Sequence, residues 1–154
     1  MTCLPTVPED TPNAARLFAA AQSAATEELK REIIHRARRV TLPESGILLR
    51  EGDQPDSLYL LIKGEVIFSI HSAGRIIPCF MVESSSLIGL SAIIARAPLA
   101  LTATASPGAE ILQMDASRFL ELIESRTEWY MSALCALAQE TVKAHQALAE
   151  MLAS

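Results

Sequence analysis

Short turn motifs divide the middle of the chain into segments of strand length, and this spacing limits the chain to few folds. The turns combine glycine or proline with small or polar neighbours: Pro43-Glu44-Ser45-Gly46, Glu51-Gly52-Asp53, Lys63-Gly64, Ala73-Gly74 and Pro107-Gly108. Glycine and proline supply the φ angles that tight turns need, and turns at such short intervals are typical of β-sandwiches and barrels. The region from Val40 to Met114 is therefore predicted to form an all-β core.

The residues between these turns alternate as strand residues do. Leu58, Leu60 and Ile62 alternate with Tyr59, Leu61 and Lys63, and Val66, Phe68 and Ile70 alternate with Ile67, Ser69 and His71. Successive side chains of a strand point to opposite faces of its sheet, so this period favours strands over helices.

Helical spacing replaces the alternation at both ends of this core and once within it. One or two amphipathic helices are predicted between Leu17 and Ala37, and a short helix between Leu87 and Ala97 that Pro98 ends. Asp115 is predicted to cap another short helix, which carries Phe119, Leu120, Leu122 and Ile123. The predicted fold class is mainly β with flanking helices, a jelly-roll barrel followed by a long C-terminal helix.

That long helix is predicted from Thr127 to Leu152, where the chain has no glycine or proline. Its residues at heptad spacing are Tyr130, Leu134, Leu137, Thr141, Ala144, Leu148 and Met151. Such a seam can pack on the barrel or pair with the same helix of a second copy. The small residues Thr141 and Ala144 would let two helices approach closely, so we favour a parallel pairing in a homodimer.

Composition restricts the partners of this chain. Its 154 residues carry 13 basic and 18 acidic side chains, a net charge of −5, which argues against direct binding to DNA. The run from His35 to Arg39 is the one basic cluster, and we interpret it as the solvated end of a helix.

The cellular location follows from the cysteines and from the apolar runs. Cys3, Cys79 and Cys135 are odd in number and scattered, which favours a reducing compartment, so we expect a cytoplasmic protein. The first 12 residues lack the features of a signal peptide, and no apolar run reaches the roughly 18 residues of a membrane span. We expect neither export nor a membrane partner.

Two glycine-centred turns joined by an apolar strand carry a resemblance to a known family. The segments are Leu49-Arg50-Glu51-Gly52-Asp53 and Leu58-Tyr59-Leu60-Leu61-Ile62-Lys63-Gly64-Glu65-Val66. With the helical elements that follow, they make the chain from Leu17 onward resemble the cyclic-nucleotide-binding, effector-sensing domain of bacterial Crp/Fnr-type transcription regulators. The resemblance implies a small-molecule sensor that dimerises through its long helix.

In that family a phosphate-binding cassette holds the ribose with a Gly-Glu pair and the cyclic phosphate with an Arg followed by Ser or Thr. Here Gly89 matches, but Leu90 stands in place of Glu, Leu99 in place of Arg and Ala100 in place of the hydroxyl residue. Burying a phosphate without a partner cation costs several kcal/mol of binding free energy, so tight binding of cAMP or cGMP is not expected. Arg96 is the nearby cation that could substitute, although we interpret it as solvated.

The resemblance therefore implies a degenerate ligand pocket, which would take a neutral or apolar molecule or none. Its residues would be Gly89, Leu90, Ser91, Leu99, Ala100 and Leu101. The family's long helix also contacts its ligand, which makes Thr141, Ala144 and His145 candidate contacts.

Metal, haem and catalysis have little support. The three histidines, His35, His71 and His145, fall on different predicted elements without metal-binding spacing. Haem would need an axial ligand such as His71, Cys79 or Met81, which we interpret as barrel residues. No nucleophile or phosphate-loop motif is present, so no enzyme is predicted and no cofactor is assigned.

The predicted organisation is a leader over residues 1–13, helices and an effector-binding barrel over 14–126, and a dimerisation helix over 127–154. The family's DNA-binding helix-turn-helix would follow that helix, and this chain lacks it. We favour a piece of a longer regulator over a stand-alone sensor. The competing function is a ligand-free dimerisation module that acts through a protein partner.

Overall fold

The computed structural model describes residues 26–153, except the side chains at 139–145, 147, 148 and 151. A helix over residues 26–36 comes first. The later elements are β1 (Arg38–Arg39), β2 (Ile47–Leu49), β3 (Ser57–Lys63), β4 (Val66–Ser72), β5 (Arg75–Val82), β6 (Leu87–Ile88), α2 (Leu90–Ala95), β7 (Thr102–Ala105), β8 (Glu110–Asp115), α3 (Ala116–Ser125) and α4 (Thr127–Ala153). The expected leader and the start of the first helical region lie outside the described residues.

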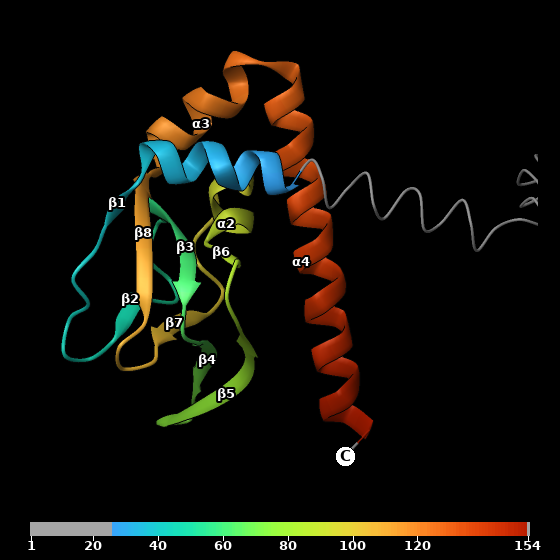
Figure 1. Cartoon of the computed structure of the whole chain (residues 1–154). Coiled ribbons are helices and arrows are strands. Elements are labelled where there is room, and N and C mark those ends of the chain that lie inside the picture. The colour runs from blue at the N-terminus through green and yellow to red at the C-terminus, as the bar shows by residue number, and fades with distance from the viewer. Residues whose placement is uncertain (1–25, 154) are drawn as a thin grey trace, which may run out of the picture.

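The strands form two four-stranded antiparallel sheets, in the orders β1-β8-β3-β6 and β2-β7-β4-β5. Apart from the β4-β5 hairpin, neighbouring strands in each sheet are distant in sequence, as in a jelly roll. The helix over 26–36 lies across one end of the barrel beside α3, and α4 runs along its side (Figure 1). The predicted fold class is confirmed.

Strand β3 separates two apolar clusters because its side chains alternate. Leu58 and Leu60 point toward the helices, where they pack with Leu29, Ile33 and Phe119. On the opposite face, Tyr59 and Leu61 join the barrel interior, whose other members include Val66, Ile88, Ala103 and Ile111. The helices are thus fastened to one face of the β1-β8-β3-β6 sheet, to which β8 adds Leu112 and Met114.

The glycines of the predicted turns have the backbone that the turns require. Gly52 has a φ of +86° and Gly64 a φ of +101°. At Gly64 a Cβ would also lie 2.8 Å from the Cβ of Ala109, so both conformation and space favour glycine.

Three local predictions are wrong in detail. Helix α2 ends at Ala95, and its C-cap Arg96 has a φ of +54°, so the helix stops before Pro98. Asp115 occupies the predicted N-cap position of α3, but it makes no side-chain capping hydrogen bond. Arg38 and Arg39, expected at a helix end, instead form β1 and pair with β8, with exposed side chains.

No described helix has the length and hydropathy that a membrane crossing requires.

Candidate ligand-binding site

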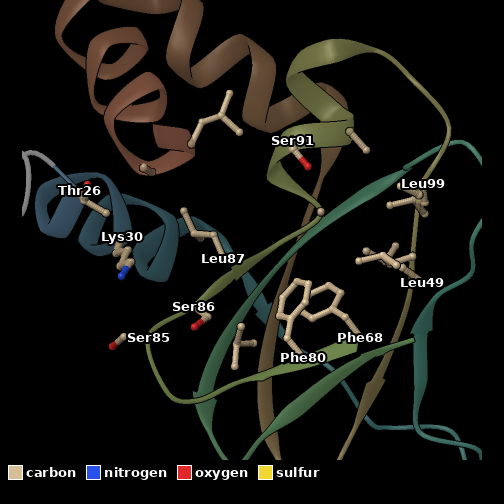
Figure 2. Close-up of a pocket in the computed structure, with 17 residues that line it drawn as sticks. Thr26, Lys30, Leu49, Phe68, Phe80, Ser85, Ser86, Leu87, Ser91 and Leu99 are labelled. Atoms are coloured by element: carbon tan, nitrogen blue, oxygen red, sulfur yellow. The ribbon is translucent and has the colours of Figure 1, made fainter. Parts of the chain in front are cut away.

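A cavity of about 270 Å³ lies where the barrel meets α2, α4 and the helix over 26–36. Figure 2 shows its lining side chains converging from these elements. The residues are Thr26, Lys30, Leu49, Phe68, Phe80, Val82, Ser85, Ser86, Leu87, Gly89, Ser91, Ala92, Leu99, Ala100, Leu101, Ala136 and Leu137. The volume lies just below the roughly 300–1,000 Å³ of common small-molecule sites, so a small ligand would fit.

The segment around α2 supplies one wall of the cavity. Of the six residues expected in the pocket, Leu90 does not line it. Leu90 is fully buried in the cluster beneath the helices, because it is the first residue of α2 and faces the neighbouring helices. The other five, Gly89, Ser91, Leu99, Ala100 and Leu101, lie on the wall.

The backbone conformation at Gly89 favours glycine, and the space between this wall and β2 is narrow. Its φ is +92°, and a Cβ there would lie 3.1 Å from Leu49 Cδ1. Leu49 itself lines the cavity, so a larger residue at Gly89 would push into the site.

A predicted turn holds Leu99 in position. The amide of Leu99 donates to the carbonyl of Asp53 at 2.9 Å, and the amide of Gly52 donates to the carbonyl of Leu99 at 2.8 Å. The Gly52-Asp53 turn thus fixes the backbone at the place where the family resemblance implies a phosphate-binding Arg.

Two aromatic side chains cover the apolar end of the cavity. Phe68 on β4 pairs in register with Phe80 on β5, and the rings stack with centroids 4.8 Å apart and an angle of 22° between planes. Leu49 and Leu99 lie beside these rings (Figure 2). This end offers only hydrocarbon surface to a ligand.

Polar groups gather at the other end (Figure 2). Lys30 reaches it from the helix over 26–36, with 16% of its side chain exposed and its Nζ 3.6 Å from Glu27 Oε1. Ser85 and Ser86 come from the turn between β5 and β6. The Ser86 hydroxyl donates to the carbonyl of Glu83 at 2.7 Å, so its oxygen can accept but its proton is engaged.

Lys30 corrects the expectation of a wholly apolar pocket. Of the side chains that the structure describes, it is the only charged one on the cavity wall. Arg96, the candidate substitute cation, lies outside the lining, with 74% of its side chain exposed and 3.9 Å from Glu124.

The long helix reaches the cavity through Ala136 and Leu137. Leu137, expected in the dimer seam, also packs against the core beneath the helices. The side chains of Thr141, Ala144 and His145, the expected ligand contacts, lie outside the described residues.

The candidate haem ligands are not on the cavity wall. His71 is mostly exposed, and its Nδ1 lies 2.9 Å from Glu51 Oε1. Cys79 is half-buried and Met81 is exposed. Within residues 26–153, no group of three or more His, Cys, Asp or Glu side chains is placed to hold a metal ion.

Sequence reasoning missed Lys30, Phe68, Phe80 and the two serines as site residues. Lys30 follows the charged face of an amphipathic helix, and the phenylalanines follow ordinary strand alternation.

Comparison with known proteins places these features in context. The family model described as the cyclic nucleotide-binding domain matches residues 39–126, more than half of the chain. No curated protein sequence matches.

Three solved structures illustrate the structural likeness. The N-terminal domain of a transcriptional regulator from Streptomyces coelicolor A3(2) is 28% identical, with a TM-score of 0.60 over 78% of this chain and 84% of that one. The Thermus thermophilus catabolite activator protein is 21% identical, with a TM-score of 0.64 over 80% and 59%. The c-di-GMP responsive global regulator CLP of Xanthomonas campestris is 18% identical, with a TM-score of 0.69 over 84% and 63%. The chain thus spans less than two thirds of the last two proteins.

Proposed function

The chain belongs to the cyclic nucleotide-binding domain family, and we propose that it is the effector-sensing domain of a Crp/Fnr-type regulator whose ligand is not a cyclic nucleotide. The observation that carries the proposal is the cavity at the junction of barrel and helices. A domain that served only to dimerise would have no need of an open site with convergent polar groups. We assign it no catalytic role.

The wall beside α2 supports a ligand other than cAMP or cGMP. Leu99 and Ala100 offer no charge or hydroxyl where the family has its phosphate-binding pair. Lys30, the cation on the wall, lies at the opposite end of the cavity from Leu99 (Figure 2). A phosphate at the family position would therefore lack a cation, which is costly in a partly buried site.

Dimerisation through α4 is the second part of the proposal. Tyr130 and Leu134 of the heptad seam are 43% and 37% exposed, whereas Ala133 and Ala136 of the same helix are buried against the barrel. An apolar strip that the barrel leaves uncovered suits a second copy of the helix.

The same helix offers a route from ligand to dimer. Ala136 and Leu137 line the cavity, about one turn from Leu134 on the exposed strip. A ligand that favours one position of α4 would shift the population of dimer arrangements by its differential affinity for them.

The proposed division of the chain is helices and an effector-binding barrel over residues 14–126 and a dimerisation helix over residues 127–154. Binding of DNA would belong to a helix-turn-helix segment outside these 154 residues, which carry a net charge of −5. The working location would be the bacterial cytoplasm.

Thermal unfolding with small ligands tests the sensing proposal. The panel is octanol, octanamide, phenylacetamide, octanoate and phenylacetate. At least one compound should raise the Tm of the chain, because a ligand that binds only the folded state stabilises it. Replacement Ala100→Trp, at an exposed position on the cavity wall, should abolish the increase by filling the space.

The matched control is Ala95→Trp, which adds the same side chain to an exposed residue of α2 outside the lining. The Tm increase should persist in this variant. If no compound raises the Tm of the unmodified chain, the alternative of a ligand-free dimerisation module, favoured by the exposed strip on α4, takes its place.

A further inference from the structure

We infer that the effector of this site is an amphipathic monocarboxylate, with its carboxylate beside Lys30 and its apolar body against Phe68 and Phe80. The inference rests on the proposed sensing function and specifies the chemistry of its ligand. It follows from the separation of the cavity into one charged end and one hydrocarbon end (Figure 2).

The charged end is suited to a single anion. Lys30 presents an ammonium group with three donors. Among the described residues its ion-pair partner is Glu27, an exposed side chain at 3.6 Å, which is longer than a hydrogen bond. Donors of the ammonium therefore remain for a ligand that reaches into the cavity.

The turn between β5 and β6 adds polar groups beside that ammonium. Ser85 holds a φ of +71°, a conformation uncommon outside glycine, and its amide donates to the carbonyl of Leu61 at 2.7 Å. Such local strain concentrates at binding sites. The Ser85 side chain lies at the cavity wall, where its hydroxyl can donate to a carboxylate oxygen.

The opposite end excludes a second charged group. Leu49, Leu99 and the stacked rings of Phe68 and Phe80 enclose it without a charged side chain, and the uncharged Ser91 hydroxyl lies on the neighbouring wall of α2 (Figure 2). An alkyl or aryl body is favoured there because contact removes apolar surface from water.

One cation and one donor hydroxyl match a carboxylate better than a phosphate. A phosphate group commonly draws a bidentate arginine or several amide donors, whereas a lysine is a point charge that one carboxylate neutralises. A neutral ligand would cover the Lys30 ammonium without replacing its water, and partly buried charges that lose water without a partner are destabilising.

Calorimetry on the intact chain separates charge from shape. Octanoate is compared with octanamide, and phenylacetate with phenylacetamide, because each pair shares its apolar body. We expect each acid to bind the unmodified chain about tenfold more tightly than its amide, the gain of a charge-assisted contact. Replacement Lys30→Met should remove that preference while the amides bind as before.

Two further variants keep the test interpretable. Lys30→Arg retains the charge and should retain the preference for acids. Lys63→Met removes an exposed lysine at the end of β3 and should leave every affinity unchanged. Thermal unfolding of each variant confirms that it is folded.

Several outcomes would overturn the inference, and they are distinguishable from failure of the sensing proposal. If acid and amide bind equally, or if the preference for acids survives Lys30→Met, the effector is not a carboxylate held by Lys30. The domain could still sense an apolar ligand. Absence of binding by all four compounds removes the carboxylate, and the sensing proposal fails with it only if octanol also leaves the Tm unchanged.

Discussion

At the scale of single residues, Gly64 shows how conformation and space act together. Its φ of +101° is strained for any other residue, and a Cβ would meet Ala109 Cβ at 2.8 Å. Gly74 has a φ of +77° but open space around it. We expect Gly64→Ala to lower the free energy of unfolding by about 1–3 kcal/mol, more than Gly74→Ala does. Urea unfolding of both variants measures these free energies. Equal losses in the two variants would mean that the contact of the new Cβ with Ala109 costs no stability.

Tyr59 carries a pH-dependent contribution to stability. Burial raises the pKa of its phenol above the ordinary value of 10.0, and the charge of Asp56 raises it further. The unfolded chain therefore loses this proton first, so the contribution is present below pH 10 and is lost as the pH rises through the folded pKa. Tyr59→Phe should flatten the fall in stability above pH 10.

Urea unfolding between pH 8 and 11 measures how the free energy of unfolding falls with pH, with about one measurement per pH unit. Tyr130→Phe, which alters an exposed tyrosine, is the matched control. If the free energy of unfolding falls with pH equally steeply in the original chain and in Tyr59→Phe, Tyr59 does not cause the loss of stability above pH 10.

At the scale of elements, α4 has two faces with different partners. Ala133 and Ala136 pack on the barrel side, and Leu134 belongs to the exposed strip. We expect Leu134→Glu to convert a dimer into monomers, because it places a charge within the apolar seam of the proposed helix pair. Sedimentation equilibrium measures the change.

Ala149→Glu adds the same side chain to the same helix, at an exposed position away from the strip. This control should leave the dimer intact. A chain that is monomeric before any substitution would refute dimerisation through α4.

At the scale of the whole molecule, the site exists only where five parts of the fold meet. The two sheets, α2, α4 and the helix over 26–36 each supply part of the cavity wall. The sole charged group on the described wall, Lys30, comes from the helix over 26–36. The positive charge in the cavity therefore lies elsewhere than in a cassette that has its own Arg.

Calorimetric titration with cAMP and cGMP is the corresponding test. We expect no micromolar binding, because the wall around Leu99 and Ala100 has no cation for the phosphate. A compound that raises the Tm in the ligand panel serves as the positive control. Micromolar binding of either nucleotide would show that Lys30 or backbone amides replace the lost contacts.

Much of the fold was predictable because its signals are local. Strand alternation around β3, the glycines at Gly52 and Gly64, and the uninterrupted helix from Thr127 each depend on neighbouring residues, and each is confirmed. The ends of α2 and the role of Arg38 were not predictable in the same way. Sheet pairing with β8 draws Arg38 into a strand, and that partner is more than 70 residues away.

The sequence by itself determined the jelly roll, the order of its elements and the loss of polar residues near α2, since periodicity, turn chemistry and residue identity are written along the chain. Only the tertiary structure decided what the cavity contains. Lys30 is an ordinary helix residue until that helix folds across the barrel. Phe68 and Phe80 line the same cavity as the cassette segment only once the barrel has closed. A binding site depends on distances between residues remote in sequence, and folding alone sets those distances.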